Sequence, residues 1–201
     1  FADDKILCAH ELPAHDIQAL AKFFIASSVD FSIHHPIPDN HLFHWFAAPQ
    51  PTSDLLTRLA HLKDFASQGP YELINRATQF LAISLDGLGI IAELQNLFPH
   101  LSIIRTTSPL DRTHVWIEVF PAAASKGHAA RWLCNELGID KRNTMSIGND
   151  YNDLAMLEWT AHGYVVANGP EDLRRRFSPA PANDEHGFAA AAKLWLTELS
   201  S

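Results

Sequence analysis

Residues 144–157 read TMSIGNDYNDLAML, and this stretch decides the fold. Thr144–Ile147 have the character of a buried strand and run into a glycine, after which side-chain oxygens cluster and apolar residues return at helical spacing. Open α/β sheets bind their ligands at the carboxyl ends of the strands, where the backbone turns. Asn149, Asp150 and Asp153 carry the oxygen ligands that Mg²⁺ prefers. The stretch therefore predicts a Mg²⁺ site at the end of a parallel strand.

The segment before this stretch predicts a helix that packs on the same sheet. Ser125 is a good N-cap for a helix over residues 126–137. Four apolar residues from Ala130 to Leu137 fall at i, i+3, i+4 and i+7, which predicts one buried face. Gly138 is a typical stop for such a helix.

The segment after the stretch continues the alternation of strands and helices. The pattern predicts a strand over 163–167, a short helix over 171–176, a loop over 178–184 and a final helix that turns Phe188 and Trp195 toward the core. Helix, strand, helix, strand and helix with short connections is doubly wound α/β topology, of which these residues form only part of a sheet.

The first 120 residues predict a different arrangement. Helices are expected from Pro13 and from the cap Thr52-Ser53-Asp54 to about His61, with a third after Asp86-Gly87. A strand, a helix and a hairpin in succession are typical of an α+β unit with helices on one side of its sheet. The composition changes after Pro121, which predicts a boundary there. The predicted strands cover residues 5–8, 29–34, 41–46, 80–85, 101–107 and 114–120.

Composition and charge narrow the function classes. The chain has 201 residues, 47% of them apolar, and a formal net charge of −8, so nucleic-acid binding is not expected. No apolar run is long enough for a membrane span, and no signal peptide is visible. Cys8 and Cys134 are far apart and form no metal pattern, which favours a reducing, cytoplasmic location. Four histidines between His34 and His44 match no zinc spacing, and no zinc site is predicted.

From Ser125 onward the chain resembles the haloacid dehalogenase superfamily, specifically its Cof-type phosphatases with a large α/β cap of type IIB. Four motifs carry the resemblance in the order and at the spacing of the family. They are Ser125-Lys126-Gly127 at a helix start, the acidic motif Gly148–Asp153 with its trailing Met156-Leu157, Val166-Ala167-Asn168-Gly169 after the next strand, and Glu185-His186-Gly187-Phe188 before the last helix.

The resemblance implies a fold and a reaction. The fold is α/β, a partial Rossmann-like core plus an α+β cap, with residues 1–12 as a residual core hairpin strand, 13–120 as the cap and 121–201 as the C-terminal part of the core. The reaction is Mg²⁺-dependent hydrolysis of a small phosphorylated metabolite, such as a sugar phosphate, through an aspartyl-phosphate. A phosphomutase on the same scaffold is an alternative. The oligomeric state stays open.

The resemblance also assigns roles to individual residues. Lys126 is expected as the catalytic cation that faces the phosphate and the nucleophile. Asn152 and Asn168 are expected to contact phosphate or substrate. Asn149, Asp150 and Asp153 are expected at the metal, with Asp153 holding that site together.

The sequence departs from the family pattern in two ways. Asn149 stands where the family has an Asp, and the carboxylate follows one residue later, so either residue could ligate the metal. The Asp-x-Asp nucleophile motif, expected before the cap, is not found; Asp3-Asp4 and Asp86 do not match it. The chain alone is therefore predicted to be an inactive fragment, with an uncovered sheet edge and exposed apolar surface. A non-catalytic binding or regulatory protein is the rival reading, favoured by Asn149.

Overall fold

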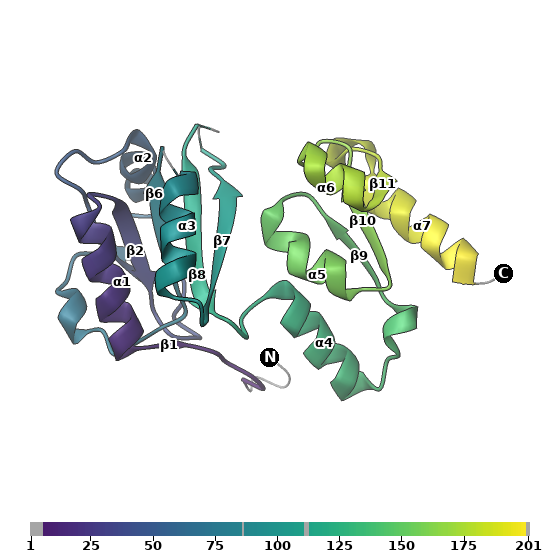
Figure 1. The fold of residues 1–201 in the computed structure, drawn as a ribbon, viewed down its shortest axis with the longest axis horizontal. Helices are drawn as coiled ribbons and strands as arrows, with labels where there is room; N and C mark the ends of the chain where they lie inside the picture. Colours follow the sequence, from purple (N-terminus) through teal and green to yellow (C-terminus); the bar gives the residue numbers. More distant parts are fainter. Residues whose placement is uncertain (1–5, 86, 111–112, 200–201) are drawn as a thin grey trace. The chain divides into compact units, whose positions relative to one another are not determined.

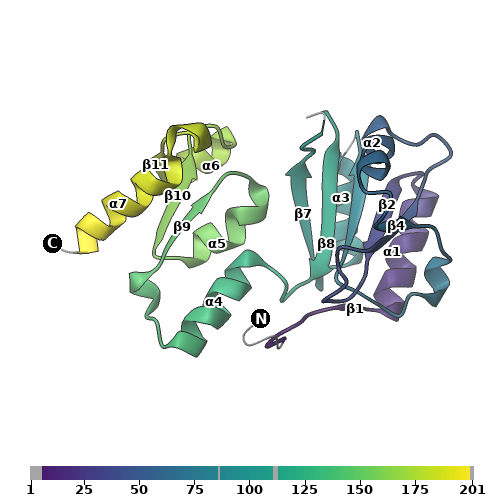
Figure 2. The same cartoon turned by 180° about the vertical axis from the view of Figure 1, so that it is seen from behind.

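The structure is a computed structural model of the chain, and it describes residues 6–85, 87–110 and 113–199. The chain forms two compact units, Phe1–Ala123 and Ala124–Ser201 (Figures 1 and 2). The contacts thus divide the chain just after Ala123, two residues beyond the composition change at Pro121.

The first unit contains a six-stranded sheet in the order β4-β3-β2-β6-β8-β7. Strand β3 pairs with β4 in parallel, and the other neighbours pair antiparallel. The elements of this unit, besides a short pair of strands described below, are β2 (Asp30–His34), β3 (Phe43–Phe46), β4 (Ala66–Ser67), β6 (Gln79–Ser84), β7 (Leu101–Thr107), β8 (Val115–Pro121), α1 (Ala14–Ala26), α2 (Ser53–His61), α3 (Gly87–Leu97) and the 3-10 turn η1 (Tyr71–Leu73).

Helices α1 and α3 cover one face of this sheet (Figure 1). The rings of Phe24, Phe31 and Phe80 meet at its centre, with centroids 5.6 Å apart for Phe24 and Phe31 and 5.8 Å apart for Phe31 and Phe80. Strand β2 alternates as the sequence predicts, with Phe31 facing this core and Asp30 the opposite face. All five residues of β2 are nevertheless buried, because the second face is covered as well.

Helix α2 lies on that second face. Its N-cap residue is Thr52, the first of the three residues expected to cap it, and the Thr52 side chain accepts the Leu55 N–H. The carboxylate of Asp30 accepts the N–H groups of Ala48 and Thr52, each at 2.7 Å, and the Thr52 hydroxyl at 2.7 Å. A buried carboxylate with three donors fixes the loop before α2, so Asp30 has a structural explanation.

A strand was predicted over residues 5–8, and residues 6–8 form none; Lys5 lies outside the described residues. Ile6 and Leu7 are 44% and 56% exposed, and no described segment pairs with them, so an extended run gains no ladder hydrogen bonds here. The first strand is β1 (Leu12–Pro13), which pairs antiparallel with β5 (Arg76–Ala77) in the same unit.

The second unit is built on a parallel sheet in the order β11-β10-β9. Its elements are α4 (Lys126–Leu137), η2 (Lys141–Asn143), β9 (Met145–Gly148), η3 (Tyr151–Asp153), α5 (Leu154–Trp159), β10 (His162–Val166), α6 (Glu171–Arg176), β11 (Ser178–Ala180), η4 (Asn183–Glu185) and α7 (Gly187–Leu199). The prediction of a loop over 178–184 was wrong at its start, where β11 pairs with Tyr164–Val166. Pro179 is tolerated because β11 is an edge strand among the described residues.

Helices cover both faces of this smaller sheet. Leu157 of α5 and Leu173 of α6 pack against Val165, and Ala191 of α7 packs against Tyr164 on the other face. This is the α/β fold class that the sequence predicted for the C-terminal segment. None of the described helices is long and apolar enough to span a membrane.

The prediction that α4 buries its apolar stripe was wrong. Leu133 and Leu137 are 49% and 62% exposed, and Phe188 on α7 is 66% exposed. Leu133 and Phe188 line a groove of about 420 Å³ that also includes Met145 of β9. Strand β9 ends the sheet among the described residues, so the uncovered edge and the exposed apolar surface that the sequence predicted are both present.

Candidate active-site loop

The candidate site is the loop that leaves the carboxyl end of β9. Gly148 ends the strand, and a Cβ atom at this position would lie 2.7 Å from the Cβ of Asp153, closer than real Cβ atoms approach. Asp150 then caps η3, with its Oδ1 accepting the Tyr151 N–H at 2.7 Å, and Asp153 completes a capping box with it. The chain therefore folds back sharply and brings Asp153 against the strand end.

Asp153 is the centre of the loop. Its side chain is only 5% exposed. Oδ2 accepts the N–H groups of Asn149 at 2.8 Å and Asp150 at 3.4 Å, while Oδ1 accepts from Nζ of Lys126 at 2.5 Å. A carboxylate offers about four lone-pair sites. Three are engaged here, so Asp153 first of all fixes the backbone of the loop and the position of the lysine.

Lys126 reaches Asp153 because α4 approaches α5 closely. A Cβ atom at Gly127 would lie 2.4 Å from the carbonyl oxygen of Ala155, so any side chain there would push the helices apart. The N-cap Ser125 accepts the His128 N–H at 3.1 Å and fixes the first turn. A cation at a helix N-terminus is disfavoured by the helix dipole, and the ion pair with Asp153 offsets that cost.

The predicted substrate contacts lie around this loop. Asn152 is half-buried in η3, and its side chain makes no hydrogen bond to another described residue. Asn168 follows β10, in a turn whose Gly169 lies against the carbonyl oxygen of Asn149. The Asn168 amide donates to Oδ1 of Asn183 at 2.8 Å, and its Oδ1 accepts the Asn183 N–H at 3.2 Å.

The donors of the loop fit a Mg²⁺ ion in part. No group of three His, Cys, Asp or Glu side chains that could hold a metal occurs among the described residues. Asn149 is exposed and Asp150 is half-buried, and both stand next to the braced carboxylate of Asp153. Mg²⁺ is commonly held by only one or two carboxylates, with waters and substrate phosphate completing its octahedron. An amide and a carboxylate at a strand end are compatible with that arrangement.

The sequence predicted the polar residues of this site but not the contacts that hold them in place. The close contact of Gly127 with Ala155 and the reciprocal bonds between Asn168 and Asn183 give no periodic signal, because they join residues of separate elements. The Lys126-Gly127 pair was the only hint of the helix contact. Asp3, Asp4 and Asp86, considered and rejected as nucleophiles, lie outside the described residues.

Three of the four histidines between His34 and His44 contact one another or an arginine. His35 Nε2 lies 3.2 Å from His44 Nε2, and His34 lies between the Asn40 carbonyl and Arg58, at 3.0 and 3.2 Å. A carbonyl can only accept and a guanidinium can only donate, so His34 is the neutral tautomer with its proton on Nδ1. Burial, more than the nearby Arg58 charge, lowers the pKa of His34 to about 4.

The chain thus combines an α+β unit with an α/β unit that carries the candidate loop. Residues 1–191 match the family of haloacid dehalogenase-like hydrolases, and the chain belongs to that family. The resemblance seen in the sequence is therefore confirmed.

Individual relatives agree with this assignment. The chain is 30% identical over 112 residues to the 5-amino-6-(5-phospho-D-ribitylamino)uracil phosphatase YwtE of Bacillus subtilis. The aligned segment covers 55% of this chain and 38% of that protein. A solved haloacid dehalogenase-like hydrolase from Bacteroides thetaiotaomicron superposes with a TM-score of 0.67 at 16% identity, over 94% of this chain and 70% of the other. A solved sugar phosphatase of subclass IIB superposes with a TM-score of 0.75 at 17% identity, over 97% and 71%.

The chain matches less than half the length of several curated relatives. The aligned segments span 36%, 28% and 44% of the lengths of curated relatives from Streptococcus pyogenes, Bacillus subtilis and Haemophilus influenzae.

Proposed function

We propose that the whole protein hydrolyses a small phosphate monoester, with a sugar phosphate as the substrate class. The observation that carries the proposal is the Lys126 ammonium held 2.5 Å from Asp153, at the end of a parallel strand beside Asn149 and Asp150. The subclass IIB sugar phosphatase with the same fold supports the substrate class. Residues 121–201 would form the C-terminal part of the core and 13–120 the cap.

In the reaction that the family implies, an aspartate carboxylate attacks phosphorus and forms an acyl phosphate. The ester oxygen leaves with a proton from a second acid, and water then releases phosphate. Lys126 would neutralise negative charge on the phosphate oxygens and on the attacking carboxylate, because its ammonium is held in place before substrate arrives. Asn152 and Asn168 would donate amide N–H groups to the phosphate or to a substrate hydroxyl.

Mg²⁺, when bound, neutralises charge on the transferring phosphoryl group. Asn149 and Asp150 would hold the ion, and Asp153 would keep both in place through their backbone N–H groups. An amide in place of a carboxylate at residue 149 removes one negative charge from the site. This favours weak occupancy by Mg²⁺ in this chain.

We infer that the 201-residue chain alone does not turn over phosphate esters, since its sequence contains no Asp-x-Asp motif after a strand to form the acyl phosphate. Turnover of p-nitrophenyl phosphate by this chain would contradict the inference. We also propose a cytoplasmic location, which the two free cysteines, Cys8 and Cys134, support.

The experiment compares the chain with the protein expressed at the full length that its gene encodes. The latter should hydrolyse p-nitrophenyl phosphate and members of a sugar phosphate panel when Mg²⁺ is present. Lys126→Met should lower its kcat by about 10²–10³-fold, because a fixed charge at the phosphoryl group is lost. Lys193→Met is the matched control, since Lys193 is exposed on α7 and lies outside the loop.

A rival function is a non-catalytic protein that binds a phosphorylated metabolite. Asn149 is the feature that favours it. Binding of a sugar phosphate by the full-length protein, measured by calorimetry, without any release of phosphate would support this rival against the hydrolase.

A further inference from the structure

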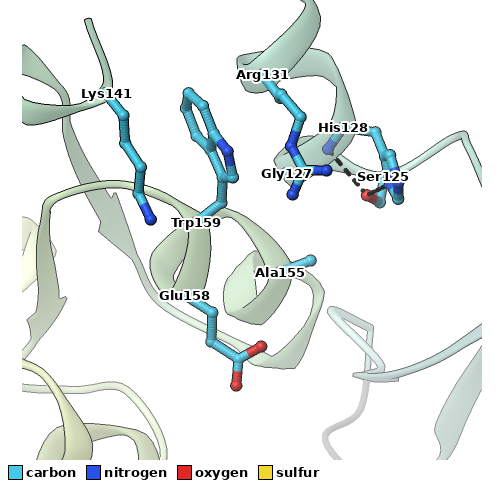
Figure 3. A pocket seen from close by; sticks show the side chains of 8 residues that line it. All are labelled: Ser125, Gly127, His128, Arg131, Lys141, Ala155, Glu158 and Trp159. Atoms are coloured by element: carbon cyan, nitrogen blue, oxygen red, sulfur yellow. Dashed lines mark hydrogen bonds between the residues drawn. The ribbon is translucent and has the colours of Figure 1, made fainter.

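A pocket of about 280 Å³ lies between α4, η2 and α5 in the second unit, and none of its lining residues is assigned to the reaction or to the metal. Figure 3 shows its side chains. Arg131 comes from α4, Lys141 from η2, and Trp159 and Glu158 from the end of α5. The chain as a whole carries a net charge of −8, so these two cations stand against the overall charge of the molecule.

The two cations of the pocket are not neutralised. Neither Arg131 nor Lys141 makes a side-chain hydrogen bond or an ion pair with another described residue. The other cations nearby behave differently: Lys126 pairs with Asp153, Arg175 with Glu171, and Arg176 with Glu158. The pair with Arg176, at 2.5 Å, also uses the only carboxylate that lines the pocket, and Figure 3 shows the Glu158 side chain directed away from Arg131.

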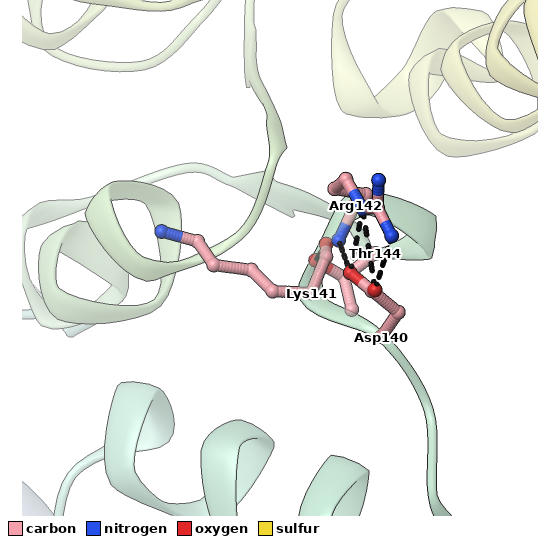
Figure 4. A network of polar contacts seen from close by, with 4 residues as sticks. All are labelled: Asp140, Lys141, Arg142 and Thr144. Carbon is pink, nitrogen blue, oxygen red and sulfur yellow. Dashed lines mark hydrogen bonds and ion pairs between the residues drawn. The ribbon is translucent and has the colours of Figure 1, made fainter.

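The neighbour of Lys141, by contrast, is paired. Arg142 donates from Nε and Nη2 to the carboxylate of Asp140, at 2.8 to 3.2 Å. These hydrogen bonds lower the pKa of Asp140 to about 2. Figure 4 shows that the Lys141 side chain leaves η2 in the opposite direction, away from this pair.

We propose that this pocket binds a small organic phosphate, with Arg131 and Lys141 holding the anionic group and the half-buried indole of Trp159 packing against its organic part. A guanidinium presents paired N–H donors that match phosphate oxygens, and an ammonium adds a second charge. The volume is near the lower end of the range for small-molecule sites. The proposal does not depend on the hydrolase function, because it uses none of the residues assigned to that reaction.

The test uses phenylphosphonate, a dianion with a flat ring and no hydrolysable ester, added to the 201-residue chain labelled with ¹⁵N. We expect saturable shifts of the Trp159 indole signal and of amides in α4 and η2. Arg131→Ala and Lys141→Ala should each weaken binding by about tenfold, the loss typical of one charged contact to an anion. Arg142→Ala removes the same charge from the adjacent position and should change the affinity less than about twofold, because its guanidinium is already paired.

Two further variants separate this pocket from the candidate active site. Lys126→Met should leave the affinity unchanged, whereas loss of binding in Lys126→Met but not in Arg131→Ala would assign the probe to the Asp153 loop and overturn the proposal. Glu158→Gln should change the affinity less than about twofold, because its carboxylate is already paired with Arg176. Equal losses in Arg142→Ala and Arg131→Ala, or no shift of the Trp159 signal at all, would also overturn it. Because Arg131 and Lys141 are exposed, both variants should fold, which their unperturbed amide spectra would verify.

Discussion

Lys126 and Asp153 meet at 2.5 Å although 27 residues separate them in the chain, and the lysine side chain is 50% exposed while the carboxylate is 5% exposed. The buried partner therefore depends on the exposed one for its counter-charge. The backbone N–H groups of Asn149 and Asp150 supply the remaining donors to the same carboxylate.

Lys126→Met should destabilise the second unit, because Asp153 would keep two backbone donors and lose its cation. We expect a loss of about 1 kcal/mol in the free energy of unfolding, the lower end for a charge-assisted hydrogen bond, since the lysine is half exposed. Urea denaturation followed by hydrogen exchange of β9 and α5 would measure it. Lys193→Met should leave stability unchanged, and equal effects of the two substitutions would contradict the role given to the ion pair.

Gly127→Ala tests the contact between α4 and α5, because helix propensity and packing predict opposite changes in the free energy of unfolding. Helix propensity alone predicts that alanine stabilises α4 by about 1 kcal/mol. The Cβ would however lie 2.4 Å from the Ala155 carbonyl oxygen, and overpacking against backbone costs about 1–3 kcal/mol. We expect net destabilisation in urea unfolding. Ala129→Gly, at an exposed position of the same helix, is the control for propensity and should cost about 1 kcal/mol.

The sequence predicts the position of most elements and much less about what covers them. The helix over 126–137 begins at Ser125 and ends at Gly138, whose φ of 64° is the left-handed conformation of a C-cap. Its apolar stripe was correctly located but is not buried, since periodicity identifies an apolar face and cannot say whether another element lies against it. Strand β11 was missed because a three-residue edge strand with a proline has the composition of a loop.

For the candidate loop too, the sequence predicts which residues lie together but not how they contact one another. Its oxygens cluster within five residues and were visible in the sequence, as was Lys126, which was expected to face the phosphate and the nucleophile and not Asp153. The hydrogen-bond pattern was not visible, because it depends on backbone N–H groups that every residue carries. For that reason the sequence could group Asn149, Asp150 and Asp153 but could not separate the carboxylate that braces the loop from the side chains beside it.

The first unit should lose stability as the pH falls from about 6.5 to about 4. The unfolded His34 imidazole has a pKa of 6.5 and binds a proton across this window, while the folded one, with its pKa lowered to about 4, does not. As the pH falls, the unfolded state therefore binds this proton before the folded state does. The free energy of unfolding decreases by about 1.4 kcal/mol per pH unit at most. His34→Gln should flatten the pH profile of urea unfolding, and His61→Gln, at an exposed position, should not. An unchanged slope in His34→Gln would exclude this histidine as the cause.

Asn149→Asp should strengthen metal binding by the 201-residue chain. An added carboxylate beside Asp150 raises the ligand charge, and we expect the Kd for Mg²⁺ to fall by about tenfold. Calorimetry with Mg²⁺ alone would measure the change. Asn135→Asp adds the same charge on the exposed surface of α4 and should have little effect. Equal tightening in both variants would indicate a general electrostatic effect and not a site.

The apolar groove beside β9 should bind a hydrophobic dye such as anilinonaphthalene sulfonate. Phe188→Asp should reduce the dye fluorescence, because this ring is 66% exposed and lines the groove. Leu88→Asp is the matched control, since Leu88 is 63% exposed on α3 and does not line this groove. A larger reduction in the Leu88 variant would assign the dye to the first unit instead.

The contact of Gly127 with Ala155 also limits how α4 can move. With no side chain between them, the two helices cannot slide past each other without breaking the contact, so they respond to a displacement as one body. One side of α4 carries Lys126 to Asp153, and Arg131 is just over one turn further along. The position of Lys126 relative to Arg131 is therefore set by one helix that is packed at one backbone contact, whether or not either site holds a ligand.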